Sequence, residues 1–213
     1  LLEQLDDYSH ALDAWLRTGR RLPDPLLRAL ADGAPPDPAD WPALVQALLR
    51  AHRAHLIDRF PPYRELAERA DRLLPAATGA GFVPVGDEQA DAQFVEDLAV
   101  WYHLAWFGET VRRGDPRVPQ LEAKARGYTA ADRRLVLEIV ADVLVGLVPR
   151  YRRLLGSGRV ELSVTPWGHP IVPLLLDFNV ARESLPDATL PADPSYPDGE
   201  GRERLPEGVN ERR

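Results

Sequence analysis

The sequence feature that most constrains the fold is an alternating stretch in the last third of the chain. Apolar and polar side chains alternate from residue 160 to residue 165, in the order VELSVT. A period of two predicts a β-strand with one face on a core and the other in polar surroundings. Pro166 has no amide hydrogen to donate, so it should end the strand. We therefore expect a stiff loop that presents Trp167 and His169.

Helical patterns account for most of the remaining sequence. Apolar side chains recur at spacings of three and four in residues 1–16, 40–59, 63–74, 91–107 and 129–155. Thr129 and Asp132 resemble a capping box at the start of the longest of these helices. Residues 75–91 are rich in glycine, alanine and proline and predict a long loop or lid. A helix, a glycine turn and then a strand is the order of an α/β repeat.

Composition excludes several classes of function. The net charge is −7, and the 33 acidic residues are spread along the chain, so nucleic acid is not expected as a partner. The absence of cysteine excludes disulfides and thiolate metal sites. No apolar run reaches the roughly 20 residues that a membrane span needs, so we expect no membrane and a cytoplasmic location. The chain has no methionine, which predicts a segment of a larger protein.

The stretch from Gly158 to Leu174 resembles the second signature region of glycoside hydrolase family 57, in its α-amylase and amylopullulanase-like branch. The residues that match are Gly158, Val160, Glu161, Thr165, Pro166, His169, Pro170, Ile171, Pro173 and Leu174. Residues 101–107 and 2–8 are similar to segments that lie upstream of that region in the same branch.

This resemblance implies an α/β fold, namely a segment of an incomplete (β/α)7 barrel with a large helical insertion and far more helix than strand. Residues 1–198 would belong to the catalytic domain. Residues 1–128 would form the helical insertion, residues 129–178 the long helix with the barrel strand and its loop, and residues 199–213 an irregular tail.

The resemblance also implies a retaining α-glucan-acting glycoside hydrolase or glucanotransferase. The family's nucleophile and acid lie in regions that this chain lacks, so no catalytic residue is expected here and the chain alone should be inactive. By the resemblance, Glu161 would be a substrate-contacting carboxylate. From their place in the loop after the strand, His169 would hydrogen-bond a sugar hydroxyl or orient a carboxylate, and Trp167 would stack on a sugar ring. The implied partner is an α-glucan or oligosaccharide, without a cofactor or metal.

Each candidate residue also has a purely structural interpretation. Glu161 would be an exposed or ion-paired residue, His169 would stiffen the loop, and Trp167 would cover the core. The aromatic run from Trp101 to Phe107 is either core or a platform for stacking sugars, and core is favoured. For the whole chain, the alternative is a non-enzymatic helical interaction module.

Two pairs of residues could supply ligands to a metal ion, and each pair also has a simpler role. His52 and His55 share a helix face at a spacing of three, but no third ligand stands beside them, which favours solvated or partly packed histidines. His169 and Asp177 would supply at most two ligands. Asp177 follows an apolar run, and its expected role is to cap the turn after it.

Overall fold

The computed structural model describes residues 2–74, 88–161, 163, 171, 173–174 and 177–190. These residues contain helices and connecting segments but no strand. The elements are α1 (Leu2–Thr18), α2 (Pro25–Ala31), η1 (Pro38–Asp40), α3 (Trp41–Leu48), η2 (Arg53–Ile57), α4 (Pro61–Leu73), α5 (Glu88–Trp106), α6 (Glu109–Gly114), α7 (Arg117–Lys124), α8 (Ala130–Gly156), η3 (Phe178–Val180) and α10 (Ala181–Ser184). Of these, η1 and η3 are 3-10 turns, and η2 is a single π-helical turn.

The predicted α/β barrel segment is wrong, because the described chain is helical. Within the expected strand, residues 160, 161 and 163 are described, and none of them is in a strand. Alternation shows only that the two faces of a segment differ. A strand also needs a neighbour that pairs with its backbone amides and carbonyls, and the described residues offer none.

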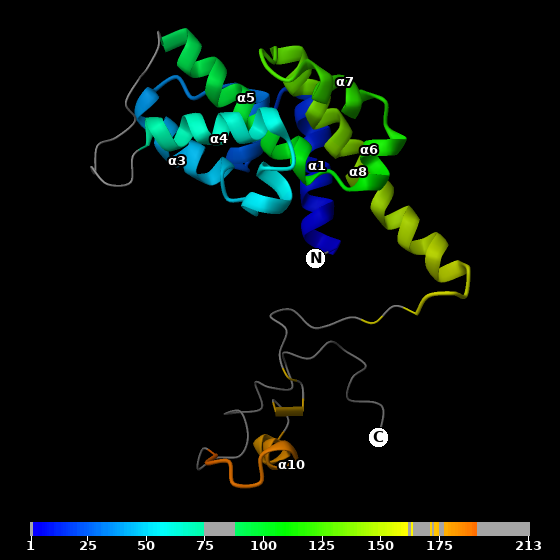
Figure 1. Cartoon of the computed structure of the whole chain (residues 1–213). Helices are drawn as coiled ribbons and strands as arrows, with labels where there is room; N and C mark the ends of the chain where they lie inside the picture. Colours follow the sequence, from blue (N-terminus) through cyan, green and yellow to red (C-terminus); the bar gives the residue numbers. More distant parts are fainter. Residues whose placement is uncertain are drawn as a thin grey trace. The chain divides into compact units, whose positions relative to one another are not determined.

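The chain divides into two compact units, residues 1–153 and 154–213. In the first unit, α5 lies at the centre and contacts α2, α3, α4 and η2 (Figure 1). Buried side chains occupy almost the whole circumference of α5 between Phe94 and Ala105. A helix that is apolar on nearly all sides has to be enclosed by other helices, and this composition explains its central place.

Local capping explains where several helices begin. Asp24 Oδ1 accepts hydrogen bonds from the amides of Leu26 and Leu27, at 2.8 and 3.0 Å, at the start of α2. The predicted capping box before α8 is confirmed: the Thr129 amide donates to Asp132 Oδ2 at 2.7 Å, and the Asp132 amide donates to Thr129 Oγ1 at 3.3 Å. These bonds satisfy amides that the first helical turn leaves free.

One predicted helix is interrupted. The pattern after Asp40 predicts a helix to about residue 59, but α3 ends at Leu48 and a π-helical turn follows at η2. Tyr63 from α4 donates its hydroxyl hydrogen to the Leu48 carbonyl at 2.6 Å. This contact satisfies one of the terminal carbonyls of α3, so the helix can end there without a glycine.

A buried ion pair connects three helical segments of the first unit. Arg133 on α8 pairs with Glu96 on α5, and Arg133 Nε donates to the Leu30 carbonyl near the end of α2 at 3.2 Å. The side chain of Arg133 is only 8% exposed. The pair lies against Gly33, whose φ of +86° is in the left-handed region.

Gly33→Ala is expected to destabilise the protein by about 3 kcal/mol, whereas Gly19→Ala should cost about 1 kcal/mol. Both glycines have positive φ, +86° and +72°. A Cβ at Gly33 would lie 2.5 Å from Glu96 Oε1 and 3.0 Å from Arg133 Nη2, whereas one at Gly19 would meet nothing within 4 Å. Urea unfolding of the two variants measures the difference in the free energy of unfolding. Equal losses of stability would show that the Glu96 and Arg133 side chains can move away from the new Cβ at little cost.

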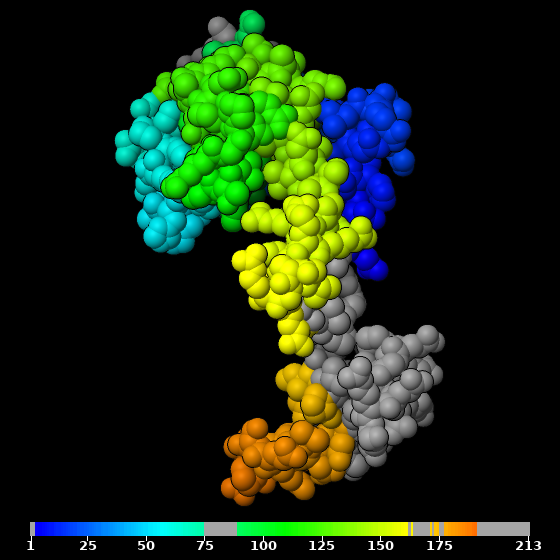
Figure 2. Space-filling view, turned by 90° about the vertical axis from the view of Figure 1, so that its right-hand side faces the viewer, coloured from blue at the N-terminus to red at the C-terminus, as the bar shows by residue number. Residues whose placement is uncertain are grey.

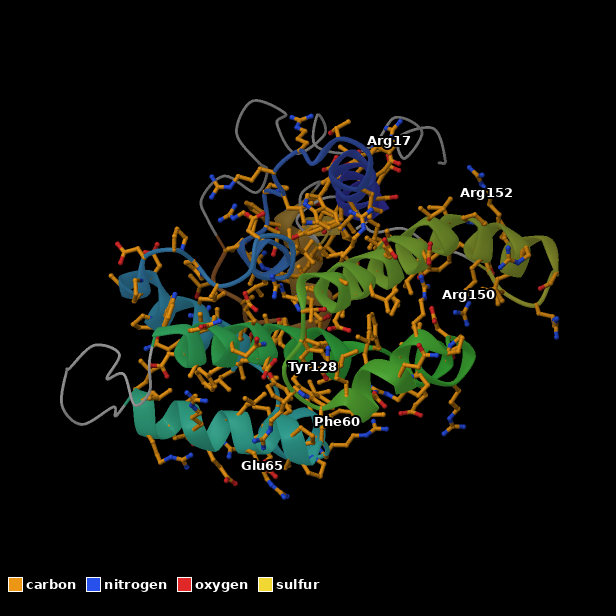
Figure 3. All side chains as sticks on the ribbon, turned by 90° about the horizontal axis from the view of Figure 1, so that it is seen from above. Arg17, Phe60, Glu65, Tyr128, Arg150 and Arg152 are labelled. Atoms are coloured by element: carbon orange, nitrogen blue, oxygen red, sulfur yellow. The ribbon has the colours of Figure 1, made fainter. Side chains whose placement is uncertain are left out.

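The first unit continues into α8, whose two halves differ in exposure. Val136, Leu137 and Ile139 are buried, whereas Val145, Leu154 and Leu155 are exposed. Arg150 and Arg152 project from the same later half and are also exposed (Figure 3). None of the described helices is both long enough and apolar enough to cross a membrane.

In the second unit, the described residues include η3 and α10. Asp177 Oδ1 accepts the Asn179 amide at 2.9 Å and caps η3, which confirms the capping role expected for Asp177.

Candidate functional site

The residues predicted to bind sugar are described only in part. Glu161 is exposed, and it forms no ion pair within the described part of the chain. Trp167 and His169 lie outside the described residues. The grouping of these three side chains therefore stays a prediction.

The aromatic run on α5 separates into core and surface. Trp101 is 2% exposed, its Nε1 donates to the Ala125 carbonyl at 2.7 Å, and its ring lies 5.7 Å from that of Phe60. The core interpretation is confirmed for this residue. Trp106, one and a half turns later, is 56% exposed, and Tyr102 between them is partly buried. The run therefore presents aromatic rings to solvent as well as to the core.

Side chains from three segments gather around the exposed rings. The Tyr8 hydroxyl, on α1, donates to Asp24 Oδ2 at 2.9 Å, and Asp24 also acts electrostatically on Tyr102 and His103. The Tyr102 ring lies 5.1 Å from His103 and 6.4 Å from Trp106, with both pairs edge to face. We call Tyr8, Asp24, Tyr102, His103 and Trp106 the aromatic surface.

The aromatic surface carries titratable groups that stay uncharged near neutral pH. Burial and the nearby Asp24 carboxylate raise the pKa of Tyr102, and the hydrogen bond to Asp24 raises the pKa of Tyr8. Burial lowers the pKa of His103. The two phenols therefore remain protonated and the imidazole remains neutral, so these three groups offer hydrogen bonds without charge.

A polar cleft of about 320 Å³ lies beside α4 and α5. Two of the arginines that line it form ion pairs: Arg126 with Glu65, which also lines the cleft and projects from α4 (Figure 3), and Arg69 with Asp91 at 2.8 Å. Among the described residues that line it, the one aromatic ring is Phe94, which is buried beneath the Arg69 guanidinium. The cleft therefore offers no free aromatic face for stacking.

The two histidines of η2 have a structural role. His52 Nδ1 accepts the His55 amide at 3.3 Å and thereby caps the π-helical turn, and the two rings stack 4.4 Å apart. Within the described ranges, no group of three or more potential metal ligands contains either residue.

No pattern in the sequence marks Tyr8 and Asp24 as site residues. Their contact spans 16 positions and two helices, and no short-range pattern encodes it. Comparison with protein-family models, curated proteins and solved structures finds no match to this chain.

Proposed function

We propose that this chain is a glucan-binding part of an α-glucan-acting glycoside hydrolase or glucanotransferase similar to family 57. The observation that carries the proposal is the pattern from Gly158 to Leu174, in which Glu161 and His169 occupy positions matched to the family's second signature region and Trp167 lies between them. Under this proposal the chain holds the sugar and does not cleave it.

The chemistry of Glu161 supports a binding role. An ionised carboxylate accepts hydrogen bonds at two oxygens, which suits a pair of neighbouring sugar hydroxyls. Glu161 is exposed, so its carboxylate is accessible to a ligand. Cleavage with retention needs a second carboxyl group about 5–5.5 Å away, and we assign none here.

Glu161→Gln is expected to weaken the binding of maltoheptaose about tenfold, because charge-assisted hydrogen bonds to hydroxyls become neutral ones. Isothermal titration calorimetry on the 213-residue chain measures the effect. Thermal unfolding should be unchanged, since the side chain is exposed. The matched control is Glu183→Gln, an exposed glutamate on α10.

Equal affinity of the Glu161→Gln variant and the unaltered chain would remove Glu161 from the site. Release of reducing sugars from amylose by the chain alone would contradict a role limited to binding.

A second candidate function is a non-enzymatic helical interaction module. The exposed side chains of Tyr151, Leu154 and Leu155 favour it. They lie at spacings of three and four on α8 and so share one face of the helix, and adjacent exposed apolar groups are typical of protein-binding surfaces. The titration separates the two candidates, since an interaction module predicts no saturable binding of maltoheptaose.

A further inference from the structure

We propose that the aromatic surface is a second binding site for an α-glucan chain, formed by residues of the first unit. The inference rests on the proposed function for its choice of ligand. Its own basis is the arrangement of Tyr8, Asp24, Tyr102, His103 and Trp106 in the first unit.

The exposed rings supply the apolar part of such a site. Trp106 is 56% exposed and Tyr8 is 41% exposed, although aromatic side chains gain strongly from burial. A pyranose ring has C–H-lined faces that pack on the faces of aromatic rings. The Tyr102 and Trp106 rings are inclined by 61° with their centroids 6.4 Å apart, so they do not stack face to face on one another.

The polar groups around the rings match sugar hydroxyls. His103 Nδ1 lies 2.8 Å from the Ala99 carbonyl oxygen. A carbonyl oxygen accepts hydrogen bonds and cannot donate them, so Nδ1 of the neutral ring carries the hydrogen. The neutral ring then has an acceptor at Nε2. The hydroxyl oxygen of Tyr8, which donates to Asp24, keeps lone pairs that can accept. The Tyr8 hydroxyl is thus an acceptor on an exposed ring, whereas His103 Nε2 belongs to a partly buried side chain.

Charge favours a neutral ligand. Asp24 is the only one of the five residues charged at neutral pH, and its carboxylate accepts hydrogen bonds from Tyr8 and from two α2 amides. A phosphate-bearing ligand would be repelled by this carboxylate. A neutral polyhydroxylated chain meets no such penalty. A protein partner is the other class of ligand that aromatic side chains suit, and the test below distinguishes it.

The test follows the indole N–H signals of the ¹⁵N-labelled 213-residue chain during titration with maltoheptaose. Trp106→Phe assigns the Trp106 signal by its disappearance. We expect maltoheptaose to shift this signal saturably. Trp106→Ala should weaken the binding at this site about fivefold, as monitored by neighbouring amide signals, whereas Trp106→Phe should keep it within about twofold. The control is Tyr151→Ala, another exposed aromatic, on α8, which should change nothing.

The outcomes separate this inference from the proposed function. A saturable shift of Trp106 that persists in Glu161→Gln supports a second site. A Trp106 signal that stays unmoved while Glu161→Gln weakens binding overturns the inference and leaves the proposed function standing. If maltoheptaose leaves Trp106 unmoved and Trp106→Ala alters the sedimentation coefficient, the surface is a protein contact and the inference fails.

Discussion

Glu96→Ala should destabilise the protein by about 3–5 kcal/mol, the range typical when one partner of a buried ion pair is removed. The variant leaves the Arg133 guanidinium, whose side chain is 8% exposed, with the Leu30 carbonyl as its remaining described hydrogen-bond acceptor. Burying an uncompensated charge is costly because the interior solvates it poorly. Urea unfolding, followed by circular dichroism, measures the loss.

The control is Glu138→Ala, which removes an exposed glutamate–arginine pair on α8 with an N–O distance of 2.9 Å. Its expected cost is below about 0.5 kcal/mol, because water screens the pair. The double variant Glu96→Leu/Arg133→Met should recover most of the stability lost in Glu96→Ala, since no buried charge remains. Similar losses of unfolding free energy in Glu96→Ala and Glu138→Ala would show that burial of the Glu96–Arg133 pair does not determine the cost of breaking it.

Asp97→Ala should lower the free energy of unfolding by about 4 kcal/mol, because it leaves buried backbone amides without an acceptor. Asp97 is buried, and its carboxylate accepts the amides of Gly127 and Tyr128 at 3.0 and 2.9 Å and the Gln93 side chain at 2.9 Å. Alanine leaves two backbone N–H groups of the turn before α8 without an acceptor, at about 1–3 kcal/mol each. Tyr128, which this turn holds in place, is buried at the start of α8 (Figure 3).

Two variants check that explanation for Asp97. Asp97→Asn keeps one acceptor oxygen and should lose about half as much stability in the same unfolding experiment. Asp13→Ala, which breaks an exposed pair with Arg17 on α1, should cost less than about 0.5 kcal/mol. A loss in Asp97→Asn as large as that in Asp97→Ala would mean that charge, not the number of acceptors, stabilises the turn.

The sequence predicts helices well where local signals determine them. The α1 pattern and the Thr129–Asp132 box act within one or two turns, and both are confirmed. At the end of α3, the Leu48 carbonyl instead accepts a hydrogen bond from the Tyr63 hydroxyl, 15 positions away. Periodicity does not register such a contact, so the predicted helix was too long. Likewise, the period-two segment after Gly158 could not reveal whether a pairing strand exists.

The apolar pattern of a helix also does not show how much of that helix is buried. A stripe at helical spacing runs along all of α8, but only its first half is buried in the first unit. Figure 2 shows one face of this unit, with α1 in blue beside α8 in yellow-green, and the Arg134 guanidinium lies 5.3 Å from the Trp15 ring. The Tyr8–Asp24 contact joins α1 to the start of α2 and is equally invisible to local rules.

The enclosure of α5 by α2, α3, α4 and η2 has a consequence for dynamics. Its middle amides have no local route to solvent, because fraying from either end must first displace the packed side chains between Phe94 and Ala105. They should therefore exchange with deuterium only when the whole first unit opens. The slowest isotope-exchange rates in the protein will then report its global folding equilibrium, with α5 as the last segment to open.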